Sequence, residues 1–307
     1  MKETNTKNNN KLVGIAFALL ATALWSGNFV VARGWSDSIH PFSLAFYRWS
    51  VAVLVFTPFA LCSVIRDWKV IRTKLPYISI TALLGVSTFN TLIYFAGRST
   101  PALNLSLIAL TFPIFILIIS SLFFKEKITL LKALGIIIVL TGVLIIISQG
   151  QLSTLLQFSF HSGDPLMLLA AFTFSIHSIL LKNKPIGISI ISFNYMTFLI
   201  GLMILLPFYL FRIIGTAEPE TINISMFGAI LYIGIFASLI SFTSWNKAIE
   251  KIGAPSAGMI YFLLPLFSGI AAWLFIGEKL EFYHLISAAL IIIGILISNR
   301  SVKKIQK

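Results

Sequence analysis

Residues 110–129 (LTFPIFILIISSLFFKEKIT) and 261–280 (YFLLPLFSGIAAWLFIGEKL) share one pattern. Each is a long apolar run that carries a proline close to its start and a Glu-Lys pair close to its end. A transmembrane helix needs about 20 mostly apolar residues, and each stretch holds a run close to that length. The two stretches predict membrane-spanning helices, and their match indicates that one unit occurs twice in the chain.

The composition of the 307 residues agrees with this prediction. Hydrophobic residues make up 58% of the chain and charged residues 11%, whereas an ordinary soluble domain has roughly 25% charged residues. Such a chain cannot cover its surface with polar groups, which excludes a water-soluble enzyme, a nucleic-acid-binding domain and a disordered chain. The single cysteine, Cys62, leaves no intramolecular disulfide to consider.

Ten apolar runs are candidates for membrane spans, and the linkers between them are too short for a soluble domain. The predicted fold is an all-α integral membrane protein with ten transmembrane helices. The runs cover residues 12–33, 42–65, 75–97, 102–124, 130–148, 163–182, 187–212, 224–247, 254–276 and 281–299.

The distribution of Lys and Arg predicts how the chain is oriented. With ten spans both termini lie on one side, and eighteen of the 23 Lys and Arg residues then share that side, against four on the other and Arg48 inside a span. Basic residues favour the cytoplasmic side. Residues 1–11 and 300–307 are therefore predicted to be cytoplasmic tails of a multi-pass protein of the cell inner (plasma) membrane, and the net charge of +13 needs no nucleic-acid partner.

The chain also matches itself at a nearly constant offset. The predicted repeats are residues 12–149 and 163–299, with five spans each, and an odd number of spans gives the second repeat the inverted orientation. Inverted repeats are a recurring feature of secondary transporters, where they surround a central cavity. The matched pairs are Ser26–Ser175, Pro58–Pro207 and Gly85–Gly234 at a shift of 149, and Pro113–Pro265, Glu126–Glu278 and Gly142–Gly294 at a shift of 152.

Ten spans in a five-plus-five repeat resemble the drug/metabolite transporter superfamily, in its EamA branch. The segments ALWSGNFV (23–30) and FYRW (46–49) add to this resemblance, as do the two stretches quoted above. The resemblance covers nearly the whole chain and implies a membrane transporter, with no covalent chemistry and no cofactor. A family pattern with Gly-Glu after the fourth and ninth spans fits Gly277-Glu278, whereas Lys125-Glu126 departs from it at the glycine.

Arg48 is the first candidate for a substrate-binding residue, because ionisable groups inside a span are costly and tend to mark substrate paths. Its guanidinium could hold a carboxylate or phosphate in bidentate fashion; alternatively it snorkels outward or binds backbone carbonyls. Asn28 and His177 coincide under the shift of 149, and each lies one helical turn from an aromatic residue. These stripes are predicted to line a cavity, with ordinary interhelical hydrogen bonding as the alternative.

Asn90 on the third span and Tyr261 on the ninth span complete the candidate cavity residues. Pro113 and Pro265 lie within the fourth and ninth spans and are predicted to kink these helices, with a role in gating. No metal-ligand spacing, phosphate-binding loop or catalytic motif occurs, so no catalytic residue and no metal site are predicted. The predicted cavity residues are Trp25, Asn28, Arg48, Asn90, Phe174, His177 and Tyr261.

The predicted function is a secondary transporter that exports a small metabolite, an amino acid or related zwitterion, by alternating access. The alternatives are a permease for drugs or nucleotide-type metabolites, or an importer. More remote are a non-transporting receptor and a membrane-embedded enzyme, which would need clustered mid-span His, Asp or Glu residues. The expected partners are a small-molecule substrate and the lipid bilayer, without nucleic acid, for a monomer or homodimer.

The ten-span topology can be checked with cysteines placed in three loops. Cysteines at positions 68 and 183 should react with an impermeant thiol reagent only from the cytoplasmic side, and one at position 156 only from outside. Labelling of position 156 from the cytoplasm would contradict the predicted topology.

Overall fold

The structure is a computed structural model of the whole chain. It describes residues 2–124, 129–148, 150–151, 160–215, 220, 222–276 and 281–298. The Glu-Lys pairs that close the two quoted stretches, at 126–127 and 278–279, lie outside the described residues.

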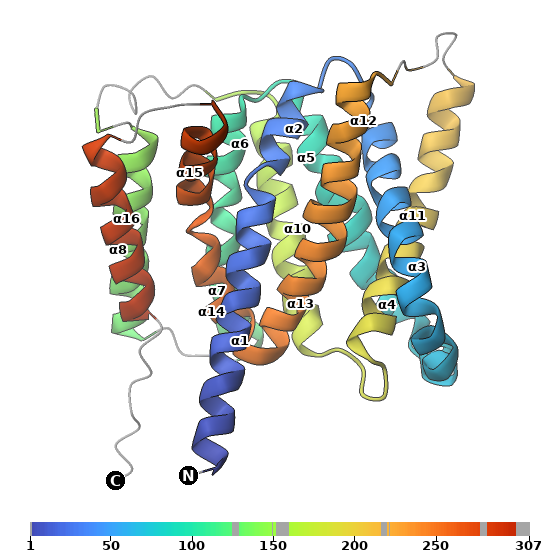
Figure 1. Cartoon of the computed structure of the whole chain (residues 1–307), viewed down its shortest axis with the longest axis horizontal. Helices are drawn as coiled ribbons and strands as arrows, with labels where there is room; N and C mark the ends of the chain where they lie inside the picture. Colours follow the sequence, from blue (N-terminus) through green and yellow to red (C-terminus); the bar gives the residue numbers. More distant parts are fainter. Residues whose placement is uncertain are drawn as a thin grey trace.

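The described part of the chain is built from helices that run up and down along one common direction (Figure 1). We call the end at which α1 begins the lower end and the opposite end the upper end. The first half contains α1 (Lys2–Trp25), α2 (Asn28–Gly34), α3 (Pro41–Thr73), α4 (Leu75–Ala82), the π-helix η1 (Leu83–Thr88), α5 (Phe89–Gly97), α6 (Ala102–Ala109), α7 (Thr111–Phe124) and α8 (Leu130–Ile147). The second half contains α10 (Asp164–Lys182), α11 (Ile190–Ile214), α12 (Ile224–Leu231), the π-helix η2 (Tyr232–Ile240), α13 (Ser241–Ile252), α14 (Ala254–Tyr261), α15 (Leu264–Ile276) and α16 (Phe282–Ser298).

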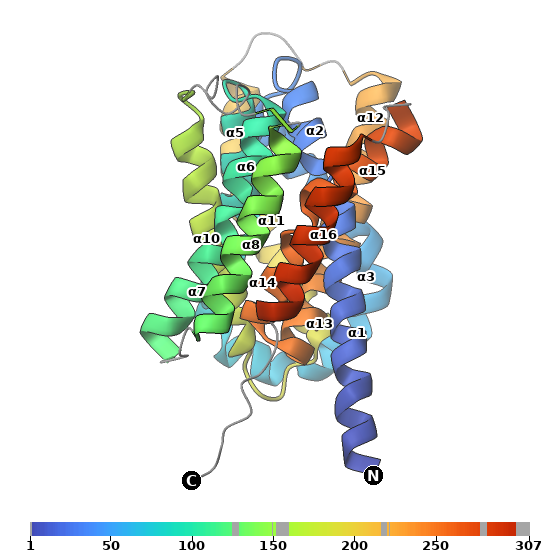
Figure 2. The same ribbon diagram turned by 90° about the vertical axis from the view of Figure 1, so that its left-hand side faces the viewer.

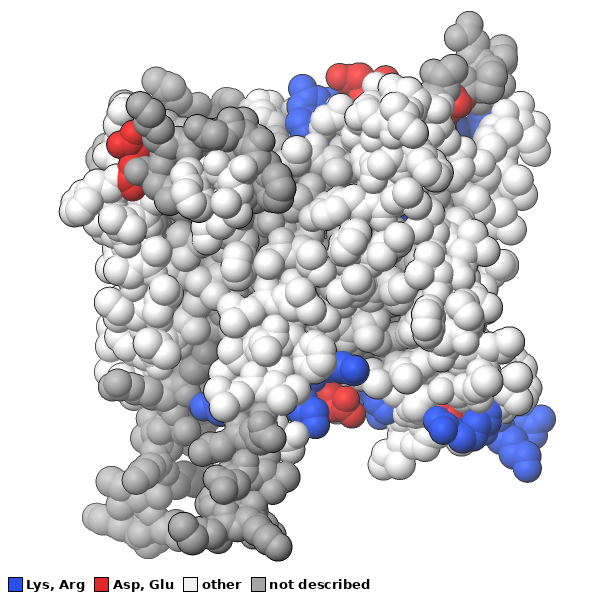
Figure 3. Space-filling model, viewed as in Figure 1, with Lys and Arg blue, Asp and Glu red and all other residues white. Residues whose placement is uncertain are grey.

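All ten apolar runs are helical in this structure. Seven segments among the described residues are long and apolar enough to cross a membrane, and three shorter apolar helices accompany them. The face shown in Figure 3 carries a broad uncharged band, with Lys, Arg, Asp and Glu gathered at the two ends. The chain is therefore an all-helical, multi-pass membrane protein.

Two of the predicted spans are broken at their prolines. Proline lacks an N–H, and its ring clashes with the carbonyl four residues earlier. Helix α6 ends at Ala109, four residues before Pro113, and α14 ends at Tyr261, four residues before Pro265. In each case a new helix starts two or three residues later and carries the proline in its first turn. The proline chemistry thus explains why these spans consist of two helices.

Helices α8 and α16 form a pair at one edge of the bundle and cross at close range (Figure 1 and Figure 2). Glycines make this approach possible. A Cβ atom added to Gly135 would lie 2.6 Å from the carbonyl oxygen of Gly294, and one added to Gly294 would lie 2.6 Å from the oxygen of Gly135. Small residues at helix crossings are a common device in membranes, where packing rather than water drives helix association.

We expect Gly135→Ala to destabilise the protein by about 1–3 kcal/mol, because the added methyl group forces the two backbones apart. The matched control is Gly228→Ala in α12, since a Cβ atom there meets nothing within 4 Å and alanine is the better helix former. Thermal unfolding in detergent measures both variants. Equal thermal unfolding midpoints for the two variants would contradict the close crossing of α8 and α16.

Candidate functional site

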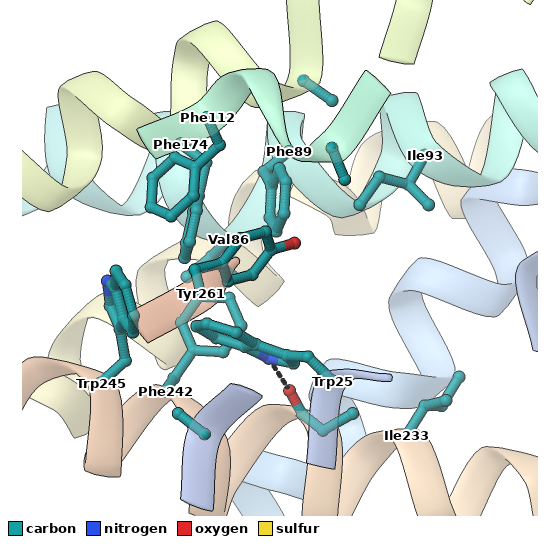
Figure 4. Packing of buried hydrophobic residues seen from close by; sticks show 14 of the residues in the cluster. Trp25, Val86, Phe89, Ile93, Phe112, Phe174, Ile233, Phe242, Trp245 and Tyr261 are labelled. Atoms are coloured by element: carbon teal, nitrogen blue, oxygen red, sulfur yellow. Dashed lines mark hydrogen bonds between the residues drawn. The ribbon is translucent and has the colours of Figure 1, made fainter. Parts of the chain in front are cut away.

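A cluster of aromatic rings fills the space between α1, α10, α13 and α14 (Figure 4). The ring of Trp25 lies 5.5 Å from that of Phe174, 5.3 Å from that of Trp245 and 6.0 Å from that of Tyr261, measured between ring centroids. All four residues are buried. The structure therefore brings together three predicted cavity residues from three different spans, and in this conformation their rings pack against one another.

Arg48 forms a polar centre beside this cluster. Its side chain is fully buried. Nη1 donates to Asn28 Oδ1 and to Tyr94 Oη, both at 2.8 Å. Nη2 donates to the carbonyl of Ala237 at 2.9 Å, and Nε donates to Ser238 Oγ. One side chain on α3 thus joins α2, α5 and η2, and four of its five N–H groups are used.

The charge of Arg48 is not neutralised by these contacts. Each acceptor named above is an amide, a hydroxyl or a carbonyl, and the ion pair seen among the described residues joins Arg66 to Asp67 instead. A buried charge is costly unless it is paired and hydrogen-bonded. Hydrogen bonds reduce this cost here, but the centre keeps a net positive charge that favours an anionic group.

The two π-helices each offer a backbone carbonyl to side chains from elsewhere. In η1 the carbonyl of Val86 accepts from Trp49 Nε1 at 3.1 Å and from Asn90 Nδ2 at 3.4 Å. In η2 the carbonyl of Ala237 accepts from Trp25 Nε1 at 2.9 Å as well as from Arg48. π-helical turns are rare and occur often at functional sites. Sequence reasoning missed these carbonyls, because a backbone acceptor has no residue-type signal.

Asn28 and His177, the two residues matched by the shift of 149, have different surroundings. Asn28 belongs to the Arg48 centre, whereas His177 is buried with its ring stacked on Phe174. His177 Nδ1 lies 3.0 Å from the carbonyl oxygen of Thr81, and Nε2 has no partner in the described part of the chain. A Cβ atom on Gly85 would lie 2.1 Å from His177 Nδ1, so the imidazole occupies the space that this glycine leaves.

A buried pair of amides was not among the predicted residues. Asn246 Nδ2 on α13 donates to Asn194 Oδ1 on α11, and both side chains are buried. Within the described ranges, Asn246 Oδ1 and Asn194 Nδ2 have no partner. The only sequence signal was a polar side chain inside each apolar run. The pair combines an unused acceptor with an unused donor.

A cavity of about 580 Å³ lies at the lower end next to this pair. It contains both charged and apolar side chains, and the buried Asn246 is part of its wall. The lining residues are Leu181, Lys182, Lys184, Ile186, Gly187, Ile190, Phe193, Asn246, Ile249, Glu250 and Gly253.

A second cavity of about 700 Å³ lies at the upper end, between the start of α3 and the end of α11. His40 lies in its wall, and its Nδ1 accepts from the backbone N–H of Phe42, which caps α3. Burial lowers the pKa of His40, and the positive charges of Arg212 and Arg98 lower it further. A neutral imidazole is what this capping bond requires. The lining residues are His40, Phe42, Pro207, Phe208, Phe211, Arg212 and Gly215.

The chain is similar over most of its length to proteins named as transporters. It is 26% identical to an uncharacterized transporter of Archaeoglobus fulgidus over 285 residues, which cover 91% of this chain and 95% of the relative. It is 28% identical to the uncharacterized transporter YdfC of Bacillus subtilis, with 94% of this chain and 91% of the relative covered.

A solved protein structure has the same fold, with a TM-score of 0.73 at 17% identity over 95% of this chain and 96% of that chain. The model of the EamA-like transporter family matches twice, over residues 12–148 and again over 161–300. These two matches cover most of the sequence, and the chain therefore belongs to the EamA-like transporter family.

Proposed function

We propose that this protein is a secondary transporter that exports a small zwitterionic metabolite, such as an amino acid, across the inner membrane by alternating access. Membership of a transporter family and the multi-pass helical fold support transport itself. The observation that carries the substrate class is the buried Arg48 guanidinium, whose partners named above are all neutral.

The pattern of helix contacts supports two inverted halves of five spans. In this proposal α1 corresponds to α10, α3 to α11, and α8 to α16. The spans made of several helices correspond in chain order, so that α5 matches α13, α6 matches α14 and α7 matches α15. Helix α1 packs on α13, α14 and α15, and α10 packs on the corresponding α5, α6 and α7. Helix α3 packs on η2, and α11 packs on η1. Exchanging the two halves leaves this set of neighbours unchanged, as a pseudo-twofold arrangement requires.

The charge distribution supports a cytoplasmic lower end. When the helices are followed along the chain, most described Lys and Arg residues lie at that end, and the positive-inside rule favours a cytoplasmic location for it. The basic residues at the lower end are Lys11, Arg66, Lys69, Arg72, Lys74, Lys132, Lys182, Lys184, Lys247 and Lys251, and those at the upper end are Arg33, Arg98 and Arg212.

The lower cavity supports uptake of the substrate from the cytoplasm. Its wall includes Lys184 and Glu250, charges of both signs, and the unused Asn246 acceptor lies beside it. A zwitterion has an ammonium group for such an acceptor and a carboxylate for a cation. From there the substrate would pass the aromatic cluster, and its carboxylate would then replace neutral partners of Arg48.

The proposed function is tested by efflux from proteoliposomes loaded with labelled amino acids. We expect efflux that unlabelled zwitterions on the outside accelerate by exchange, whereas amines and carboxylic acids that lack one of the two charged groups have little effect. Equal acceleration of efflux by the single-charge analogues would contradict a zwitterionic substrate. Absence of flux with every tested metabolite would count against transport of this class.

We expect Arg48→Lys to reduce transport more than tenfold, because one ammonium group cannot reach acceptors on α2, α5 and η2 together. Loss of even one hydrogen bond to a charged group, about 1.5–3 kcal/mol, has an effect of that size. The control is Arg72→Lys on the same helix, where the side chain is exposed. Flux is measured after both variants are shown to insert and unfold cooperatively. Full transport activity of Arg48→Lys would show that the planar guanidinium with its several donors is not required for transport.

A further inference from the structure

A carboxylate binds the start of α11 at the lower end of the molecule, and another binds the start of α3 at the upper end. At the lower end Asp67 Oδ2 accepts from the backbone N–H of Ser189 at 2.9 Å and from Ser192 Oγ at 2.8 Å. At the upper end Glu220 Oε1 accepts from the backbone N–H of His40 at 2.9 Å. Ser189 is the N-cap residue of α11 and His40 that of α3.

The helix starts that these two carboxylates bind are equivalent under the internal repeat. His40 falls on Ser189 at the shift of 149 that also matches Gly85 with Gly234. In each contact the carboxylate comes from the far end of the other helix: Asp67 lies in the last turns of α3, and Glu220 follows the end of α11. Each half of the molecule therefore holds the start of the other half's second span.

Both contacts have the chemistry of strong attachments. A carboxylate at a helix N-terminus interacts favourably with the free N–H groups and with the helix dipole. A hydrogen bond to an ionised acceptor is roughly twice as strong as one between neutral groups. Asp67 is only 8% exposed, so water competes weakly for it. Separation of the start of α11 from Asp67, or of the start of α3 from Glu220, must break the contact at that end.

Each contact also borders one of the two cavities. The lower cavity is lined by Gly187 and Ile190, which flank Ser189 in the chain. The upper cavity is lined by His40 itself. In this structure both contacts are formed, and the aromatic cluster is packed between them. The molecule is therefore held at both ends at once.

We propose that Asp67 and Glu220 are positioning residues that decide which end of the transporter opens. Opening of the lower end breaks the bonds of Asp67 to Ser189 and Ser192, and opening of the upper end breaks the bond of Glu220 to His40. Loss of either carboxylate then shifts the protein toward the state that is open at that same end. This inference rests on the proposed transport cycle, but it concerns only the helix ends.

The test measures the two ends separately by pulsed electron paramagnetic resonance between spin-label pairs. One pair is placed at positions 68 and 186 at the lower end, and the other at positions 38 and 214 at the upper end; all four side chains are exposed. Cys62, which is exposed, is replaced by serine. The variants are Asp67→Asn and Glu220→Gln, each nearly isosteric, with Asp37→Asn as the control for an exposed carboxylate at the upper end.

We expect Asp67→Asn to raise the ratio of long to short distances about tenfold for the lower pair only, the equivalent of about 1.4 kcal/mol. Glu220→Gln should do the same for the upper pair only, and Asp37→Asn should change neither. Ser192→Ala keeps the contact of Asp67 with Ser189, so it should change the distance ratio of the lower pair in the same direction but by less. It replaces Asp67→Asn in the test if that variant does not fold.

Two outcomes would overturn the proposal. One is a shift of the same pair by both variants. The other is a lower unfolding temperature with both distance distributions unchanged, which would make the carboxylates helix caps only. Flux measured on the same samples separates this inference from the proposed function. Opposite shifts without any flux would leave the positioning role intact and reject transport of the tested substrates.

Discussion

Polar groups within the apolar band have no water to bind, and this constraint governs the structure. A backbone or side-chain group left without a partner in such surroundings costs several kcal/mol. The described backbone meets the constraint by being largely helical. Where the backbone widens into η1 and η2, tryptophan N–H groups bind the carbonyls.

The same constraint explains why Arg48 joins so many elements. A guanidinium has five donors, and no single neighbouring helix presents enough acceptors for it. The acceptors come from α2, α5 and the second half's η2, so the charge links the two halves of the molecule. The residue at the matching place in the second half is Thr197, whose hydroxyl is bound within its own helix. The charge at the centre therefore has no counterpart at the matching position of the second half.

Two kinds of contact hold the halves together. The aromatic rings of Trp25, Phe174 and Trp245 make ring contacts with one another, and the two indole N–H groups donate to Ala237 and Ser178 outside the ring cluster. The carboxylate contacts at Ser189 and His40 are short and directional, so they are either made or broken. A packed centre with a discrete attachment at each end is compatible with the transport cycle proposed above.

The sequence by itself determined the helical membrane class and the ten apolar runs, and it predicted kinks at Pro113 and Pro265, where the structure has breaks. It did so because hydropathy and proline chemistry act locally, within about one helical length. It also pointed to Trp25, Phe174 and Tyr261, which the structure brings into one cluster. Only the tertiary structure decided the partners of Arg48, the Asn194–Asn246 pair and the carboxylates at the helix ends. These depend on the rotation and depth of each helix relative to the others, and an apolar run of this composition is compatible with many such arrangements.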